Sequence, residues 1–551
     1  MKTILVSINA KFIHTNNAVR LLKVNTDFPV DIFEYTIKDN IDNIIKDLIE
    51  ANPDVIGFSA YIWNINIILE ILNKLSLNGS KSLLSNSKII LGGPEVSYES
   101  AHLLTKYPID YILKGESELS FHELLTCINN QMNPSEIPGI TLLSQGKIIN
   151  NPIVEIKELN TIRSPYYLEE DVVNIPNKIS YIESSRGCPY SCSYCLSSLE
   201  KKVRFFDIVE VQKAILYLMK HGSKIIKFLD RTFNANKNTF DLLKFIIDHH
   251  NGLTVFQFEI TGDVLNKEII HYLNSHAPKG LFRFEIGIQS INYETNFLVD
   301  RIQNNELLFE NIKLIQEGNV IDLHLDLIAG LPKENLSSFK DTFNTVYRLG
   351  AKELQLGFLK MLKGTKIRSE SEKYLYQYEP LAPYEFISNE SLSQDDKEEI
   401  HMVEKMLALY HNKGYFGSNL QKLIMNYYSP YDFFHDIGRF YTQNQLPSTA
   451  YQVHELYQNL FQFIESPYDE FLLIIDYLRR AKIKPKLFWE NPITKQTRQQ
   501  IFDYMTKTYS YLNLNVLYKH SVVLEGKEMF YIIIYQNSSS TDYFIKKTLI
   551  I

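Results

Sequence analysis

The sequence predicts an α/β protein. We expect a Rossmann-like, doubly wound parallel sheet at the N-terminus, a second block of parallel βα units, and a mainly helical C-terminal part that ends in a β-hairpin. Short β-rich runs alternate with helical stretches in residues 1–135 and again in residues 179–375, which is the pattern of parallel sheets. Residues 376–551 instead carry amphipathic helical patterns that are dense in Tyr and Phe.

Length and composition limit the kinds of protein that the chain can form. With 551 residues, 45% of them hydrophobic and 22% charged, the chain has the composition of a soluble globular protein of about three domains. The net charge of −7 gives no general attraction to nucleic acid. Four cysteines make no disulfide framework, and no uncharged apolar run reaches the ~18 residues of a membrane helix. We therefore expect a cytoplasmic protein with no membrane partner, and we do not expect it to bind nucleic acid.

The first block, residues 1–135, is expected to form the N-terminal sheet. Strands are predicted at Thr3–Ile8, Asp31–Ile37, Asp54–Tyr61, Lys88–Gly92 and Tyr111–Lys114. Helices should lie between them, as at Ile41–Ala51, where five apolar residues form one stripe. Ligands of such sheets bind outside the carboxyl ends of the strands. Those ends carry Asn9, Ser59, Tyr61, Gly92, Gly93, Pro94, Glu95, Gly115 and Glu116.

Residues 136–178 are predicted to form a linker because turn-forming Pro, Gly and Asn residues recur in them. The linker should contain a small hairpin, with Ile140–Leu143 paired to Lys147–Ile149. It leads into a strand at Ile179–Ser184 and then into the cysteine loop.

The cysteine loop holds Cys188, Cys192 and Cys195, spaced Cys-x3-Cys-x2-Cys. Sulfur ligands favour zinc or an iron–sulfur cluster. A structural zinc site needs four closed ligands, so three local cysteines fit better with a cluster in which one iron stays open. The alternatives are a zinc site that borrows a distant His, or a chance spacing of buried thiols. Cys127 has no cysteine neighbour in the sequence and is expected to be a small buried residue.

This loop resembles the signature of the radical S-adenosylmethionine (SAM) enzymes, Cys-x3-Cys-x-aromatic-Cys, with Tyr194 as the aromatic residue. The resemblance implies a [4Fe–4S] cluster on the three cysteines and SAM chelated by the fourth iron. It also implies a 5′-deoxyadenosyl radical and an electron donor such as flavodoxin or ferredoxin.

The second block, residues 179–375, continues the βα alternation. Further strands are predicted at Lys224–Leu229, Val255–Ile260, Leu281–Ile288, Asp322–Ile328 and Glu353–Leu359. Helices are predicted at Val209–His221, Thr239–His250, Lys267–Ser275, Asn292–Leu298, Glu306–Glu317 and Ser337–Leu349. The resemblance implies that this block is the partial (β/α)6 barrel of the radical SAM superfamily, with its chemistry at the C-terminal strand ends.

The same resemblance suggests residues that contact SAM. They are Tyr194, Asp230, Glu259 for the ribose, Gln289, Arg301 for the carboxylate, and Gly330 beside the adenine. The alternative for each polar residue is that it only caps a helix or keeps the barrel end soluble. Glu285 is expected to be structural.

The first block resembles the cobalamin-binding domain of cobalamin-dependent radical SAM enzymes. The resemblance rests on Asn9–His14, Gly57–Ser59, Leu91–Glu95 and Leu113–Glu116. It implies that cobalamin lies at the strand ends described above. The Asp-x-His-x-x-Gly motif is absent, since the nearest string, Asp322-Leu323-His324, has Leu327 where Gly is required. His14 is then a candidate cobalt ligand, although a capping or core role fits it as well. The alternative for the whole domain is a Rossmann-like module without a cofactor.

Residues 376–551 are expected to form a helical, aromatic-rich domain. Helices are predicted at Gln394–Asn412, Leu420–Met425, Ala450–Glu465 and Glu470–Ala481. A terminal hairpin is predicted to pair Tyr511–Tyr518 with Met529–Gln536 around Glu525–Lys527. A similar segment follows the radical SAM domain in one branch of the cobalamin-dependent enzymes, where its role is undefined.

The resemblance leads us to expect a cobalamin-dependent radical SAM enzyme that transfers a methyl group to an unactivated carbon. One alternative is another radical reaction, such as a rearrangement or cyclisation, with a vestigial cobalamin domain. The other is a cluster-bearing regulatory or RNA-modifying partner.

Overall fold

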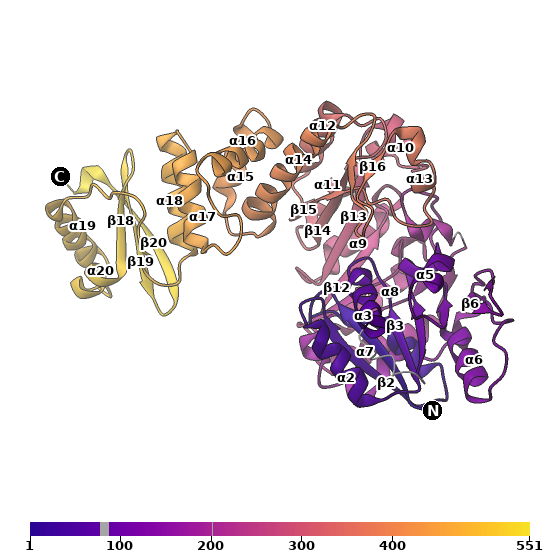
Figure 1. The fold of residues 1–551 in the computed structure, drawn as a ribbon. Coiled ribbons are helices and arrows are strands. Elements are labelled where there is room, and N and C mark those ends of the chain that lie inside the picture. Colours follow the sequence, from indigo (N-terminus) through magenta and orange to yellow (C-terminus); the bar gives the residue numbers. More distant parts are fainter. Residues whose placement is uncertain (78–86, 201, 551) are drawn as a thin grey trace. The chain divides into compact units, whose positions relative to one another are not determined.

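The computed structural model describes residues 1–77, 87–200 and 202–550 and divides the chain into two compact units (Figure 1). The first unit is Met1–Lys397 and the second is Glu398–Ile551. Within the described residues, no helix has the length and apolar character needed to cross a membrane.

The N-terminal sheet has the strand order β2-β1-β3-β4-β5-β6-β7. The first five strands in chain order are parallel, and β6 and β7 form an antiparallel hairpin that extends the sheet beyond β5. The strands are β1 (Thr3–Asn9), β2 (Val30–Thr36), β3 (Val55–Ser59), β4 (Lys88–Gly92), β5 (Tyr111–Leu113), β6 (Ile140–Ser144) and β7 (Lys147–Asn150). The helices are α1 (Asn17–Val24), α2 (Ile41–Ala51), α3 (Ile65–Leu77), α4 (Pro94–Ser97), α5 (Ser100–Lys106) and α6 (Glu118–Asn129).

This sheet is doubly wound because helices cover both of its faces. Ile4 and Val6 of β1 pack with residues of α2 and α3 on one face, whereas Leu5 packs with α6 on the other. Every residue of β1 is buried, as expected for a central parallel strand covered on both sides. The predicted Rossmann-like sheet is therefore confirmed.

The chain between the hairpin and the second sheet is irregular and contains short 3-10 turns. They lie at Leu159–Thr161, Pro165–Tyr167, Glu169–Asp171 and Ile175–Asn177.

The second sheet is parallel, with the order β15-β14-β13-β12-β11-β8. Its strands are β8 (Ser180–Ile182), β11 (Ile225–Phe228), β12 (Val255–Ile260), β13 (Phe282–Gln289), β14 (Asp322–Ala329) and β15 (Glu353–Phe358). Its helices are α7 (Ile208–Lys220), α8 (Thr239–His249), α9 (Lys267–His276), α10 (Tyr293–Leu298), α11 (Asn305–Gly318) and α12 (Leu336–Tyr347). Short elements follow at α13 (Lys366–Ser369), β16 (Gln377–Tyr378) and β17 (Phe386–Ser388).

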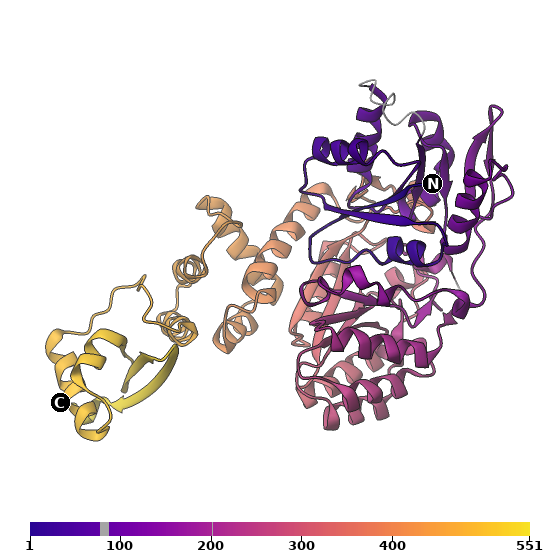
Figure 2. The same cartoon turned by 90° about the horizontal axis from the view of Figure 1, so that it is seen from below.

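The two faces of the second sheet differ in polarity. Alternate residues such as Phe256, Phe258 and Phe284 are fully buried, and Figure 2 shows helices layered along one side of these strands. The intervening residues are polar and pair with one another, as Lys227 does with Glu285 (Nζ to Oε2, 2.7 Å). Glu285 is thus part of an internal ion pair, which agrees with its expected structural role. The apolar face forms the core of the sheet, and ion-paired polar side chains line the other face.

The C-terminal unit is helical and ends in antiparallel strands. Its helices are α14 (Gln394–Leu407, beginning in the first unit), a π-helical turn (Ala408–Asn412), α15 (Ser418–Asn426), α16 (Pro430–Gln443), α17 (Val453–Phe463), α18 (Pro467–Arg480), α19 (Lys495–Thr508) and α20 (Leu514–His520). The strands are β18 (Ser521–Glu525), β19 (Met529–Gln536) and β20 (Ser539–Lys546), in that order in the sheet. Buried Tyr410, Tyr441 and Tyr457 lie among these helices, so the aromatic residues do form a core.

The predicted strand at Tyr511–Tyr518 is wrong. The apolar residues at 512, 514 and 516 alternate like a strand, but residues Leu514–His520 form helix α20. The Asn513 side chain caps this helix by accepting a hydrogen bond from the Val516 N–H at 2.9 Å. Leu517 then turns into the core and is fully buried. The partner of β19 is instead Ser521–Glu525.

A buried charge network joins the N-terminal sheet to the cysteine loop. Arg204 of β10 (Arg204–Phe205) donates to both carboxylate oxygens of Glu116 at 2.7 Å. Arg186 of β9 (Ser185–Arg186) donates to Glu118 at 2.6 Å and to Glu183 at 2.9 Å. Arginine side chains with 9% and 5% exposure must be paired to be buried. We call these five residues the Arg186–Arg204 network.

We predict that Arg204→Met lowers the free energy of unfolding by about 3 kcal/mol or more, because it leaves the Glu116 carboxylate buried without its main partner. Guanidinium denaturation followed by circular dichroism measures this loss. Lys213→Met is the matched control. It removes only the ion pair between the exposed side chains of Lys213 and Glu210, so it should leave the unfolding transition unchanged. A transition of Arg204→Met equal to that of the control would contradict the prediction.

Candidate functional site

Backbone geometry positions the cysteine loop directly after β8 and β9. Gly187 has φ of +91°, and a Cβ there would lie 2.4 Å from the Lys202 carbonyl oxygen. Only glycine fits this close approach of two backbone segments. The next residue, Cys188, donates its N–H to the Glu200 carbonyl at 3.0 Å. The loop is thereby closed on itself at the first cysteine.

The cysteine side chains lie at the C-terminal end of the second sheet. Cys188 and Cys192 are buried, and Cys195 is partly exposed. Within residues 1–77, 87–200 and 202–550, no three His, Cys, Asp or Glu side chains converge on one point that would hold a single metal ion. In an iron–sulfur cluster each thiolate binds its own iron, so its sulfurs do not converge in that way. Cys127, by comparison, is a half-buried residue of the N-terminal core.

Tyr194 and Arg301 cover the second cysteine. The Arg301 guanidinium donates to the Tyr194 hydroxyl at 3.2 Å and to the Cys192 sulfur at 3.8 Å. Tyr194 is buried, and burial raises the pKa of its phenol. Thr232 lies on the other side of the loop, with its Oγ1 3.7 Å from the Cys188 sulfur. Thr232 was not predicted, although it directly follows the Asp230-Arg231 strand end.

Asp230 and Glu259 occupy different environments. Asp230 is fully buried and accepts hydrogen bonds from the Ser184 N–H at 2.9 Å and the Ser185 hydroxyl at 2.6 Å. Burial raises its pKa to about 6. It holds the strand end before the cysteine loop, so a SAM contact would require it to exchange these partners. The Glu259 carboxylate lies 3.8 Å from the Lys227 ammonium group. Because the side chain of Glu259 is partly exposed, a ligand could reach its carboxylate.

Gln289 is a strained residue at the end of β13. It has φ of +66°, and the register with β14 shifts between Gly287 and Gln289. Its Oε1 is buried and has no hydrogen-bond partner among the residues that the structure describes. Strain and an unsatisfied acceptor are typical of a ligand site, so Gln289 fits SAM. Gly330, by contrast, packs on Phe386.

Glu334 is a buried carboxylic acid near Gln289 that the sequence analysis missed. Its Oε1 accepts hydrogen bonds from the Ser290 hydroxyl and from Thr342 Oγ1 at 2.9 Å. Burial raises its pKa to about 7. Nothing in the sequence around Glu334 indicates that this side chain is buried, because its burial depends on how α12 packs.

At the N-terminal sheet, aromatic side chains gather at the ends of β1 and β3. Tyr61 stacks on Trp63, with ring centroids 4.4 Å apart and 5° between the planes. The Trp63 indole donates to the Ile8 carbonyl at 3.2 Å. Trp63 is 44% exposed and Phe12 is 64% exposed. Exposed aromatic surface at a ligand-binding sheet edge suits a broad, flat group such as a corrin. Neither Trp63 nor Phe12 was predicted.

Asn9, His14 and Ser59 shape the loops at this edge. Asn9 donates to the His14 carbonyl at 3.2 Å, and Ser59 accepts from Asn16 at 2.9 Å. The His14 Nδ1 lies 2.7 Å from the Tyr181 hydroxyl of β8. Burial, with Lys11 and Lys227, lowers the pKa of His14. His14 therefore contacts the second sheet, and cobalt ligation could involve only its other ring nitrogen.

The Gly92–Glu95 segment packs against the protein itself. A Cβ on Gly93, whose φ is +111°, would lie 2.4 Å from the Ala60 carbonyl oxygen. Gly92 accepts from the Ala60 N–H at 2.7 Å. Pro94 begins α4 and is exposed, whereas Glu95 is buried and accepts from the Tyr384 hydroxyl at 2.8 Å. Glycine at position 93 is thus already required by the neighbouring backbone.

Gly115 and Glu116 follow β5. Gly115 approaches the Ile153 side chain, and both oxygens of Glu116 are used in the Arg186–Arg204 network. Burial alone would raise the pKa of Glu116, but bonds from Arg204 and the Ile156 N–H lower it. Of the residues predicted to bind cobalamin, Glu95 and Glu116 instead accept hydrogen bonds from Tyr384 and Arg204, which lie outside the N-terminal sheet. The aromatic ring of Tyr61 lies near residues that follow strands of the second sheet.

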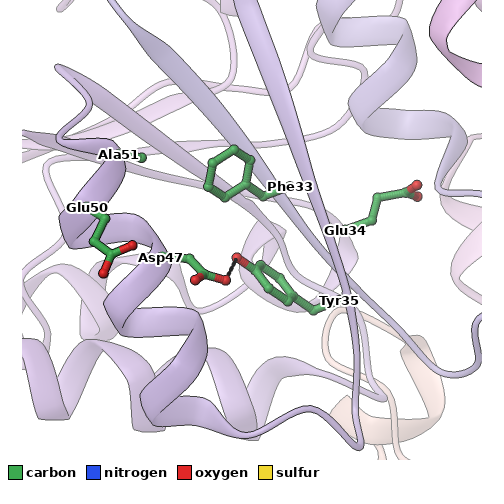
Figure 3. A pocket seen from close by; sticks show the side chains of 6 residues that line it. All are labelled: Phe33, Glu34, Tyr35, Asp47, Glu50 and Ala51. Atoms are coloured by element: carbon green, nitrogen blue, oxygen red, sulfur yellow. Dashed lines mark hydrogen bonds between the residues drawn. The ribbon is translucent and has the colours of Figure 1, made fainter.

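Two recesses lie apart from the cysteines. One, of about 510 Å³, is lined by Phe33, Glu34, Tyr35, Asp47, Glu50 and Ala51 on β2 and α2 (Figure 3). Its acids already have partners: Asp47 accepts from Tyr35 at 3.0 Å, and Glu34 pairs with Arg20. The other, of about 740 Å³, is formed mainly by α14 and α16 in the C-terminal unit.

Three protein families match successive parts of the chain. Residues 6–125 match the B12 binding domain, residues 182–346 match the Radical SAM superfamily, and residues 372–529 match a protein of unknown function (DUF4080). The chain therefore carries a B12 binding domain, a radical SAM domain and a C-terminal domain of unknown function. The radical SAM match implies a [4Fe–4S] cluster and SAM as cofactors. The match to the B12 binding domain implies cobalamin.

Curated relatives are distant. The cobalamin-dependent radical SAM methyltransferase TokK of Streptomyces tokunonensis is 22% identical over 378 residues, covering 65% of this chain and 54% of TokK. The anaerobic magnesium-protoporphyrin IX monomethyl ester cyclase of Synechocystis sp. is 26% identical over 253 residues, covering 44% of this chain and 49% of the cyclase. The chain spans about half the length of these relatives.

Solved structures share the fold. The cobalamin-dependent S-adenosylmethionine radical enzyme OxsB with aqua-cobalamin bound has a TM-score of 0.62 at 14% identity, covering 87% of this chain and 79% of OxsB. The radical S-adenosylmethionine methyltransferase TsrM from Kitasatospora setae has a TM-score of 0.56 at 16% identity, covering 67% and 76%.

We predict that Cys188→Ala, Cys192→Ala and Cys195→Ala each abolish the visible iron–sulfur absorption after anaerobic reconstitution, because each removes a cluster ligand. Absorption spectra and iron analysis measure the loss. Cys127→Ala is the matched control and should keep a full cluster. Loss in the control with retention in Cys192→Ala would refute the assignment.

We predict that Glu334→Gln stabilises the protein at pH 8 but not at about pH 5. Between the ordinary pKa of 4.5 and the raised value of about 7, the folded state keeps a proton that the unfolded state has lost. The stability of the wild type therefore falls as the pH rises through this range, and the amide removes that loss. Denaturation at both pH values tests this, with the exposed Glu294→Gln as control. An equal effect of Glu334→Gln at both pH values would contradict the prediction.

Proposed function

We propose that this protein is a cobalamin-dependent radical SAM methyltransferase that transfers a methyl group from SAM to an unactivated carbon. Its electron donor would be a protein such as flavodoxin or ferredoxin. The methyltransferase TokK, which aligns with 65% of this chain, supports the reaction type.

One observation carries the proposal. The loop that follows β1 in the B12 binding domain lies against the beginning of β8, the first strand of the second sheet. The Ile179 N–H donates to the Ile13 carbonyl at 2.8 Å, and the His14 ring bonds the Tyr181 hydroxyl. Tyr61 lies close enough to Glu183 and Arg231 for their charges to affect its pKa, which burial raises to about 12. The loop after β1 therefore lies against the beginning of β8, and Tyr61 lies near residues that follow β8 and β11, which supports a proposal in which two cofactors act together.

The chain's own residues can be given roles in this reaction. When bound, the cluster would supply the electron that cleaves SAM, and cobalamin would carry the methyl group. Cys188, Cys192 and Cys195 would hold the cluster. Gln289 offers a free acceptor to a ligand N–H or O–H, and Glu259 offers a carboxylate to hydroxyls. Trp63 and Tyr61 would cover an apolar ligand face and exclude water from it.

The second candidate is a radical SAM enzyme that rearranges or cyclises its substrate. The similarity to the magnesium-protoporphyrin IX monomethyl ester cyclase favours it. The two reactions differ in what happens to SAM, because only methyl transfer consumes SAM to S-adenosylhomocysteine.

We predict that reconstituted, reduced protein converts SAM to 5′-deoxyadenosine, and that added hydroxocobalamin also produces S-adenosylhomocysteine in an amount equal to the bound cobalamin. Mass spectrometry of both nucleosides measures this without a substrate. Formation of 5′-deoxyadenosine alone would favour the second candidate.

Binding of hydroxocobalamin to the same reconstituted protein tests the proposed cobalamin site at the ends of β1 and β3. Trp63→Ser should weaken hydroxocobalamin binding about tenfold, which is 1.4 kcal/mol, while the iron content stays unchanged. Tyr428→Ser is the matched control, since Tyr428 is a 91% exposed aromatic residue of the C-terminal unit. Failure of the wild type to bind hydroxocobalamin would refute the methyltransferase proposal.

A further inference from the structure

Arg301 is brought to the cysteine loop by the way in which α10 ends. Asp300, two residues after the end of that helix, has φ of +54°, a left-handed conformation that Asp tolerates better than most residues. The Arg301 N–H then returns to the Asn296 carbonyl at 2.8 Å. Asp300 itself pairs outward with Lys366 at 2.7 Å. The chain reversal therefore turns Arg301 inward while its neighbour stays at the surface.

All five N–H donors of the Arg301 guanidinium have acceptors. Nε and one Nη2 hydrogen donate to Gln303 Oε1, at 3.0 and 2.9 Å. The other Nη2 hydrogen donates to the Gly287 carbonyl. The Nη1 group donates to the Tyr194 hydroxyl and to the Cys192 sulfur. A contact with the SAM carboxylate would need one of these bonds to exchange, whereas the contact with the cysteine sulfur is already made.

The charge of Arg301 has no carboxylate partner among these contacts. Its acceptors are a carbonyl, an amide, a phenol and a thiol, so its positive charge is not cancelled at short range. An arginine side chain keeps its proton in proteins, so the guanidinium of Arg301 is a cation. Among these acceptors, the sulfur of Cys192, 3.8 Å from Nη1, is the one that would bind the cluster.

We propose that Arg301 sets the reduction potential of the [4Fe–4S] cluster through its charge and its N–H···S bond to Cys192. Reduction adds one electron, from an external low-potential reductant, to [4Fe–4S]²⁺ and yields [4Fe–4S]⁺ with no bond broken. A nearby cation stabilises the more negative, reduced form. Hydrogen bonds to sulfur and local charge are the factors by which proteins tune such clusters. Arg301 thus makes the cluster easier to reduce.

The test is a redox titration of the reconstituted full chain without SAM or cobalamin, followed by electron paramagnetic resonance of the reduced cluster. In Arg301→Met, the ratio of reduced to oxidised cluster at a fixed potential should fall at least tenfold, a shift of 59 mV for one electron. Arg301→Lys keeps the charge and should stay closer to the wild type. Lys213→Met, which removes an exposed positive charge paired with Glu210, is the control and should leave the potential nearly unchanged.

A second variant keeps the test decisive if Arg301→Met does not assemble a cluster. Gln303→Glu keeps the guanidinium in place and sets a negative charge against it, so it should also shift the potential to more negative values. A wild-type potential in either cluster-bearing variant, Arg301→Met or Gln303→Glu, would overturn the proposal. The titration needs only the cluster, so its result is independent of whether the enzyme transfers methyl groups.

Discussion

Two guanidinium groups, those of Arg186 and Arg204, are buried against carboxylates, and these ion pairs hold the B12 binding domain against the cysteine loop. Arg186 and Arg204 lie on the two short strands that flank the loop, while Glu116 and Glu118 belong to the turn and helix that follow β5. Neither set can be buried alone without a cost of several kcal/mol per charge. The two domains therefore bury these groups together, and the position of the first cysteine follows from that docking.

The polarity of the barrel sheet fits this arrangement. One face is filled by phenylalanines against the helices, and the other presents Lys227, Glu259 and Glu285. A polar inner face costs little when its charges pair with one another, and it leaves acceptors that a polar ligand can use. The contact between His14 and Tyr181 places the loop that follows β1 beside this face. A polar barrel interior and an aromatic sheet edge thus meet in one unit of the protein.

Polar residues at the strand ends divide into two groups in the structure. Glu95, Glu116 and Asp230 are occupied by Tyr384, Arg204 and two serines, and they hold loops in place. Gln289, Glu259 and the Tyr61–Trp63 pair keep an acceptor or a face available. The first group makes the site rigid and the second can contact ligands, as a preorganised site requires. Charge, hydrogen bonding and burial around Cys192 then depend on Arg301, which belongs to neither sheet.

The sequence by itself determined the order and kind of nearly all elements in the first 375 residues, because hydrophobic periodicity and turn residues are properties of neighbouring positions. It also determined the cysteine spacing, the Rossmann-like sheet and the parallel second sheet. It misjudged Tyr511–Tyr518, where an Asn cap outweighed an alternating pattern. Only the tertiary structure decided that Glu116 meets Arg204, that Trp63 lies on Tyr61, and that Arg301 bonds Cys192. Partners of this kind lie 2 to 109 residues apart in the chain, and a polar side chain takes its role from whichever group the folded chain places within hydrogen-bonding distance.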